Sequence, residues 1–271
     1  SGWFSTEARG TALGILSIGG SVGLIASSFL TPPSAILLGW RGTMVVSGLL
    51  GVLSTAVMWL TIKDRSAEGI PSGSRADLRD VVGSRGFWIL AVLQMVRLGS
   101  NYALIAWLPL LLQEELGLSL VAAGAAFSLF NFSGMVSNPV GGFVSDRVGE
   151  RPVLLASFAA LGLCTLLFTW ARAYVFLYLT VFAMGWFINF VRSPSFAILP
   201  RLYGVERAGR ISGMQNTFAS VGALALPFLL GYIRDTTASY WAGWAILALL
   251  MFLVAGLSFL LRTPTEEGST K

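Results

Sequence analysis

Long apolar stretches dominate this sequence. A helix that crosses a lipid bilayer needs about 20 apolar residues, and eight stretches of the chain reach about that length. Only 11% of the 271 residues are charged, whereas soluble domains carry roughly 25%. The stretches are too long and too uniformly apolar for β-barrel strands, which alternate over about ten residues. The sequence therefore predicts an all-α, polytopic membrane helix bundle. The predicted spans are Thr11–Leu30, Thr43–Ile62, Phe87–Leu112, Leu120–Val144, Pro152–Trp170, Tyr174–Leu199, Ile211–Ile233 and Trp241–Leu261.

Residue types that are rare or missing exclude several functions. The chain has no histidine, which removes most metal sites and most general bases. Its single cysteine, Cys164, excludes an internal disulfide. The net charge of +5 does not indicate a nucleic-acid partner, because the basic residues are spread over short loops rather than gathered on one face. We expect no metal, no cofactor, no nucleic acid and no enzymatic activity.

Basic residues outside the spans predict how the chain crosses the membrane. With eight spans both termini lie on one side, and that side holds thirteen Lys and Arg residues against three on the other. Loops rich in Lys and Arg stay in the cytoplasm. The sequence therefore predicts a multi-pass protein of the cell (plasma or inner) membrane, with both termini and the loop at 63–86 in the cytoplasm.

An internal similarity predicts that the chain is part of a longer protein. Glu7–Gly23 and Glu206–Gly222 share six identical residues at an offset of 199. Six matches could arise by chance in glycine-rich segments, but Lys63 and Arg262 also close corresponding spans at this offset, which favours a parallel duplication. Four spans, within residues 87–199, precede the second copy. We therefore expect four further spans before the first residue, so that the chain is an N-terminally truncated piece of a twelve-span protein.

One short loop carries a recognisable motif. Between the fourth and fifth spans the sequence reads GGFVSDRVGER, which fits the pattern G-x-x-x-D-R-x-G-x-R. This loop resembles the signature loop of the major facilitator superfamily, whose transporters have six plus six helices and a cytoplasmic central loop. The resemblance covers the whole chain and assigns its spans as the family's helices five to twelve. The matching residues are Gly142, Asp146, Arg147, Gly149 and Arg151.

The resemblance also implies a role for this loop and a division of the chain. In the family the loop is a conformational latch, and here Asp146 would meet the N-terminus of the Thr11–Leu30 helix, where a carboxylate gains about 0.3–1 kcal/mol from the helix dipole. The alternative is a solvated charged loop that only fixes orientation. Glu150 departs from the family's usual basic residue. The expected parts are a remnant of the N-terminal half with two helices at 1–62, a cytoplasmic linker at 63–86, a six-helix C-terminal half at 87–262 and a cytoplasmic tail at 263–271.

Polar side chains within the spans indicate a substrate pathway. Arg97 lies ten residues, about 15 Å of helix, beyond Phe87, and a charge at the middle of a membrane helix costs about 2.5–3.5 kcal/mol. Its guanidinium could hold a carboxylate, nitrate or phosphate group, or could have a structural role. Arg192 is a possible gate or a snorkelling side chain. The other candidate substrate-binding residues, each of which could instead form a helix–helix hydrogen bond, are Gln94, Asn101, Asn131, Asn189 and Gln215.

The expected function is secondary active transport by alternating access. The cores of the spans hold two arginines and no carboxylate, which favours a small organic or inorganic anion as substrate. A coupling ion, H⁺ or Na⁺, would make the protein a symporter, and we expect a monomer in the lipid bilayer. Two alternatives stay open. One is efflux of drugs or other amphiphiles, although the first span lacks the Gly-Pro pair of many drug antiporters in the family; the other is a non-transporting membrane sensor with the same fold.

Overall fold

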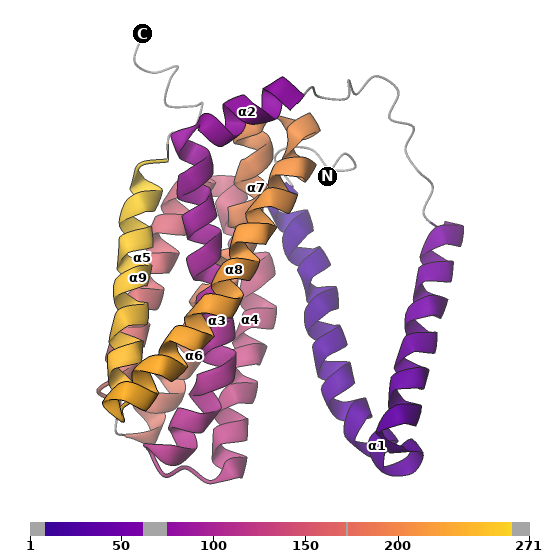
Figure 1. Cartoon of the computed structure of the whole chain (residues 1–271), viewed down its shortest axis with the longest axis vertical. Coiled ribbons are helices and arrows are strands. Elements are labelled where there is room, and N and C mark those ends of the chain that lie inside the picture. Colours follow the sequence, from indigo (N-terminus) through magenta and orange to yellow (C-terminus); the bar gives the residue numbers. More distant parts are fainter. Residues whose placement is uncertain (1–8, 62–74, 172, 262–271) are drawn as a thin grey trace. The chain divides into compact units, whose positions relative to one another are not determined.

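The computed structural model describes residues 9–61, 75–171 and 173–261, which are helical almost throughout (Figure 1). No strand occurs among these residues. The all-α fold class that the sequence predicts is therefore confirmed. The helices are α1 (Arg9–Thr61), α2 (Arg75–Gly83), α3 (Arg85–Glu114), α4 (Leu120–Val148), α5 (Glu150–Phe168), α6 (Tyr174–Phe190), α7 (Arg192–Tyr203), α8 (Val205–Thr237) and α9 (Trp241–Phe259).

Six segments of the described chain are long and apolar enough to cross a membrane. Each overlaps one of the eight predicted spans. Helix α4 matches a seventh, Leu120–Val144, and has a comparable length, but it is not among the six. The six segments are Leu37–Thr61, Arg85–Glu114, Glu150–Phe168, Tyr174–Tyr203, Val205–Thr237 and Trp241–Phe259.

The chain divides into two compact units, residues 1–18 together with 73–271, and residues 19–72. In the smaller unit α1 changes direction at Gly39, whose φ of 69° and ψ of 167° are not helical. Only glycine adopts a positive φ readily, because it has no Cβ. The sequence predicts a break between the spans Thr11–Leu30 and Thr43–Ile62. The break at Gly39 lies between these two predicted spans, and a glycine supplies its positive φ.

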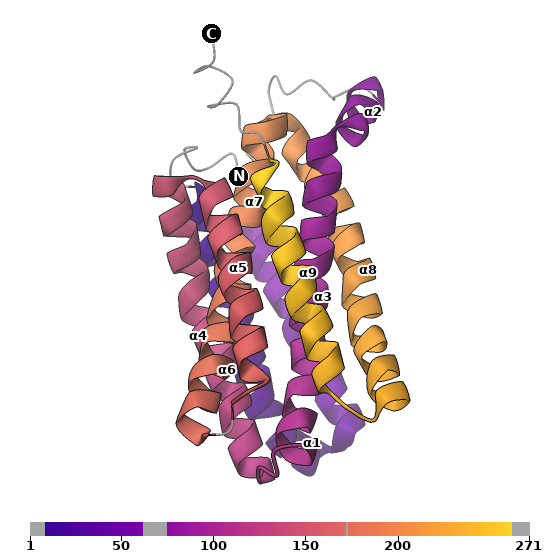
Figure 2. The ribbon, with the colours of Figure 1, turned by 90° about the vertical axis from the view of Figure 1, so that its left-hand side faces the viewer.

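The larger unit is built from three helix pairs (Figures 1 and 2). Helix α3 packs on α8, α4 on α6, and α5 on α9. Two apolar clusters fill the interior, one around Phe130 and Trp244 and the other around Phe87 and Phe158. The helices that carry the predicted polar residues are therefore held in pairs, with α3 and α8 forming one pair and α4 and α6 another.

Glycines allow two of these pairs to touch through their backbones. A Cβ built on Gly99 of α3 would lie 2.5 Å from the carbonyl oxygen of Gly222 on α8, and a Cβ on Gly222 would collide with the Met95 carbonyl. In the α4–α6 pair, a Cβ on Gly185 would collide with the Phe130 carbonyl. Small residues at helix crossings are the usual way in which membrane helices approach each other closely.

Hydrogen bonds join α3 to α8 on both sides of this crossing. Gln215 Nε2 donates to the Phe87 carbonyl at 3.1 Å, and Trp107 Nε1 donates to the Pro227 carbonyl at 2.8 Å. Both acceptors belong to the backbone, so each bond fixes the position of one helix along the other. The α3–α8 pair is thus fastened over most of its length.

A break interrupts the sixth predicted span. The sequence predicts one continuous helix over Tyr174–Leu199, but α6 ends at Phe190 and α7 begins at Arg192. Pro194 accounts for the break, because proline has no N–H and its ring clashes with the carbonyl four residues earlier, here that of Phe190. After the break, Ser193, Pro194 and Ser195 in the first turn of α7 are buried inside the bundle.

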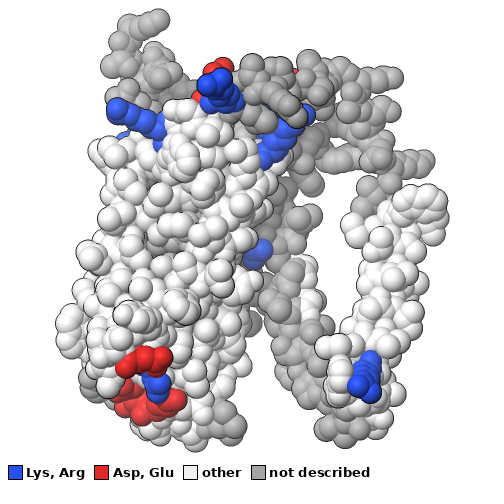
Figure 3. Space-filling model, viewed as in Figure 1, with Lys and Arg blue, Asp and Glu red and all other residues white. Residues whose placement is uncertain are grey.

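Charged residues gather at the two ends of the larger unit (Figure 3). Lys and Arg lie at the end where α2 lies, and a cluster of acidic residues lies at the opposite end. The belt between them is almost free of charge on the face shown, as expected for a surface in contact with lipid. The basic end is the one that the sequence predicts to be cytoplasmic.

Candidate functional site

Arg97, the strongest candidate from the sequence, lies inside the bundle. Only 5% of this residue is exposed, and only 1% of Gln94. Arg97 Nε donates to Gln94 Oε1 at 2.7 Å, one helical turn earlier on the same face of α3. Among the described residues the Arg97 side chain has no carboxylate partner and no other hydrogen bond. Its two terminal NH₂ groups therefore keep their hydrogen-bonding capacity for a ligand.

Two residues that the sequence reasoning missed complete this group. Ser195 Oγ lies 3.5 Å from Gln94 Oε1, and the Phe196 ring centroid lies 5.8 Å from Arg97 Cζ, within cation–π range. Both residues belong to the first turn of α7, so the helix break positions them beside α3. The signal that could have found them is Pro194 inside an otherwise apolar span, because interrupted membrane helices often mark binding sites.

The remaining predicted substrate-binding residues lie elsewhere or bond within the protein. Gln215 is fully buried and its amide joins α8 to α3. Asn131 and Asn189 each donate to the carbonyl four residues earlier in their own helix, at 2.9 and 3.0 Å. Asn101 is half-buried on α3. Their roles in substrate binding stay predictions.

The predicted latch motif forms the turn between α4 and α5. Gly149 has a φ of 89°, a conformation that favours glycine. Arg147 Cζ lies 4.0 Å from the centroid of the Phe143 ring. Arg151 donates to the Phe259 carbonyl at 2.5 Å, which fastens the turn to the end of α9. The basic residues of the motif therefore contact their own half of the protein.

The acidic residues of this turn have different surroundings. Gly142 is buried on α4, and Asp146 lies in the last turn of that helix. The side chains at the start of Thr11–Leu30, the predicted partner of Asp146, lie outside the described residues, so the latch contact stays a prediction. Glu150 is only 2% exposed and pairs with Arg201 of α7, with Oε1 and Nε 3.0 Å apart. The Arg201 N–H does not point at that oxygen, so the contact is an ion pair without a hydrogen bond.

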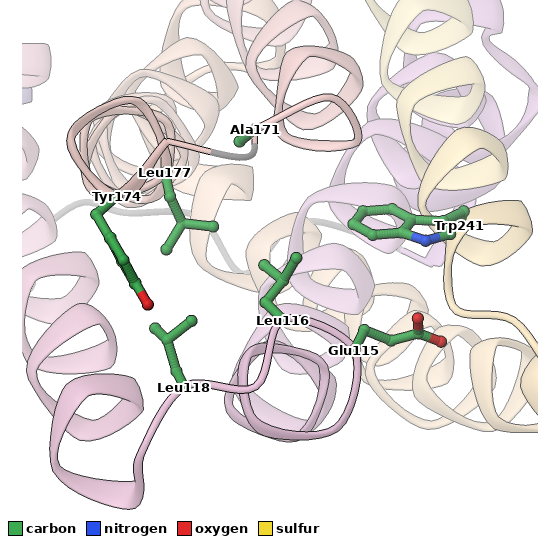
Figure 4. A pocket seen from close by; sticks show the side chains of 7 residues that line it. All are labelled: Glu115, Leu116, Leu118, Ala171, Tyr174, Leu177 and Trp241. Atoms are coloured by element: carbon green, nitrogen blue, oxygen red, sulfur yellow. The ribbon is translucent and has the colours of Figure 1, made fainter.

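A separate group of residues closes the opposite end of the bundle. Glu114 Oε2 accepts hydrogen bonds from Arg234 and from the Tyr240 hydroxyl, each at 2.7 Å. The neighbouring Glu115 helps to line a cavity of about 340 Å³, whose lining side chains are drawn in Figure 4. The cavity shares no residue with the group around Arg97 and is not part of the candidate site. Its lining residues are Glu115, Leu116, Leu118, Ala171, Tyr174, Leu177 and Trp241.

Tyr240 is expected to make stability depend on pH in the alkaline range. Its burial and its hydrogen bond to Glu114 raise the pKa of Tyr240 to about 12, from an ordinary value of about 10. The unfolded chain therefore loses this proton first, and the stabilisation that is present below about pH 10 is lost as the pH rises through about 12. We expect the thermal unfolding midpoint to fall more steeply over this range in the unsubstituted protein than in Tyr240→Phe. Equal slopes would contradict the assignment.

Comparison with known proteins assigns the chain to a family. The family model described as the Major Facilitator Superfamily matches residues 1–137 and 90–271, which together cover the whole chain. The chain belongs to the Major Facilitator Superfamily. The resemblance read from the loop motif is thereby confirmed, together with the helical membrane fold and the expectation that the protein is not an enzyme.

Individual members of the superfamily are similar over nearly the whole chain. The "probable nitrate/nitrite antiporter NarK1" of Thermus thermophilus is 27% identical over 295 residues, which cover 96% of this chain and 64% of that protein. The "membrane sensor protein UhpC" of Escherichia coli is 23% identical, with coverages of 99% and 66%. The chain therefore spans slightly less than two thirds of the length of these two relatives. A crystal structure of the E. coli fucose:proton symporter FucP superposes with a TM-score of 0.74 at 14% identity, covering 96% of this chain and 71% of that one.

Proposed function

We propose that the protein is a secondary transporter of a small anion and that Arg97 binds the anion. The observation that carries this proposal is the position of Arg97, a buried cation with one amide partner and no carboxylate partner among the described residues. The relative named as a nitrate/nitrite antiporter supports an anionic substrate and makes nitrate the first probe. Two helix bundles that rock around a site near the middle of the membrane would provide alternating access.

The chemistry of a guanidinium suits this role better than a purely structural one. A buried charge that serves only structure is usually paired, because an unpaired one is costly to desolvate. An arginine can hold a planar carboxylate or nitrate through two parallel hydrogen bonds, which a lysine cannot do. The anion would thus supply the counter-charge that Arg97 lacks within the described residues. Coupling to H⁺ or Na⁺, a monomeric state and cytoplasmic termini remain parts of the proposal.

Uptake by the full-length protein in lipid vesicles tests the role of Arg97. We expect Arg97→Gln to lower the rate of nitrate uptake at least tenfold and Arg97→Lys to give an intermediate rate, because lysine keeps the charge but loses the paired geometry. The matched control is Arg79→Gln, which removes an exposed arginine on α2 and should leave uptake unchanged. A monodisperse Arg97→Gln protein that transports nitrate at the full rate would contradict the proposal.

A membrane sensor is the second candidate, because UhpC is named as one and is similar over 99% of this chain. A sensor would bind the anion through Arg97 without moving it across the membrane. Binding of nitrate to the purified protein, together with no flux of any tested anion in vesicles, would favour this function over transport.

A further inference from the structure

A second arginine lies beside the candidate site. Arg192 is the first residue of α7, and its carbonyl accepts a hydrogen bond at 2.7 Å from Ser195, the residue that contacts Gln94. The charge of Arg192 is close enough to act on the Arg97 guanidinium. Arg192 is exposed, whereas Arg97 is buried. Ser195 and Gln94 thus form a chain of contacts from the backbone of Arg192 to the buried Arg97 guanidinium.

Two like charges at this depth need a counter-charge. Neither arginine forms an ion pair with a carboxylate among the described residues. Repulsion from Arg192 adds to the cost of burying the charge of Arg97. Every charge identified around this position is positive.

A buried donor points to the same place. Gln94 Oε1 accepts from Arg97, but Gln94 Nε2 is buried and has no hydrogen-bond partner. Buried polar atoms are nearly always hydrogen-bonded, so one without a partner needs an explanation. Because Gln94 contacts both Arg97 and Ser195 in the first turn of α7, this amide belongs to the same group of residues. It provides an N–H donor for an oxyanion held there.

We propose that Arg97 and Arg192 together bind a doubly charged anion, with Gln94 Nε2 as a third donor. A dianion would neutralise both guanidinium groups, whereas a singly charged anion would leave one positive charge uncompensated. This inference rests on the proposed function and adds the charge of the substrate. It gives Arg192 a part in binding, and it gives Gln94 two roles, because its Oε1 fixes the Arg97 Nε and its Nε2 donates to the anion.

Binding measurements on the full-length protein separate the two classes of anion. The purified protein is titrated at pH 7.5 and constant ionic strength with sodium nitrate, sodium sulfate and disodium succinate, and the thermal unfolding midpoint reports binding. We expect sulfate or succinate to bind at least tenfold more tightly than nitrate. Equal or tighter binding of nitrate overturns the inference without any substitution being made, so the test does not depend on a variant that folds.

Variants then assign the preference to Arg192. Arg192→Gln is expected to weaken the dianion at least tenfold and nitrate less than threefold, and Arg192→Lys is expected to keep the preference. Arg79→Gln, on α2, controls for a general loss of positive charge. Equal weakening of nitrate and dianion by Arg192→Gln, or no weakening of either, overturns the inference alone. If Arg97→Gln leaves the binding of every anion unchanged, the proposed function fails as well.

Discussion

Gly222→Ala is expected to force α3 and α8 apart and to destabilise the folded protein by about 3 kcal/mol, the upper end of the usual cost of overpacking. The new Cβ would collide with the Met95 carbonyl and lie 2.8 Å from Met95 Cγ. The backbone carbonyl cannot rotate out of the way as a side chain could, so the helices themselves must move. The hydrogen bonds of Gln215 and Trp107 across the pair would then lengthen or break.

A second glycine in the same helix provides the matched control. Gly213 also lies in α8, but a Cβ built there meets no atom within 4 Å. Gly213→Ala should therefore be neutral or stabilise the helix by about 0.5–1 kcal/mol, since alanine is the better helix former. Thermal unfolding in detergent, followed by size-exclusion chromatography, measures both variants. The interpretation of the crossing is wrong if the Gly222 variant is as stable as the Gly213 variant.

The position of this crossing shows what the sequence can and cannot predict. Long apolar stretches give the helices, and the predicted span Phe87–Leu112 agrees with α3 within two residues at each end. In a membrane, however, the faces toward lipid and toward other helices are both apolar, so periodicity does not reveal which helices pair. Gly99 and Gly222 lie 123 positions apart in the sequence, and no local pattern relates them.

The sequence likewise predicted only part of the candidate site. Arg97 and Gln94 stand out because polar side chains are costly inside a span, and three residues' separation places them on one face. Ser195 and Phe196 do not stand out, since serine and phenylalanine are ordinary residues of membrane helices. Their position depends on the break at Val191, and a proline shows where a helix is weakened but not how the chain continues beyond it.

The ion pair between Glu150 and Arg201 leads to the second large expected effect. Glu150 is 2% exposed and Arg201 35%, so the two partners differ in how well water can solvate them when left alone. Asp146 is near enough for its negative charge to act on Glu150. Removing Arg201 would therefore leave a buried carboxylate beside another negative charge. Removing the carboxylate would leave an arginine whose side chain can turn toward water.

We accordingly expect Arg201→Gln to destabilise the protein by about 2–3 kcal/mol, somewhat less than the 3–5 kcal/mol for breaking a fully buried pair because Arg201 is partly exposed. Glu150→Gln should cost less than half as much, since it removes the buried charge itself. The double variant should then be more stable than Arg201→Gln alone, because no buried carboxylate remains. Thermal unfolding of the two single variants and the double variant gives this comparison directly. Strictly additive effects of the two substitutions would mean that Glu150 and Arg201 do not stabilise each other across the contact between the α4–α5 turn and α7. This contact would then not explain why Glu150 departs from the family's usual basic residue.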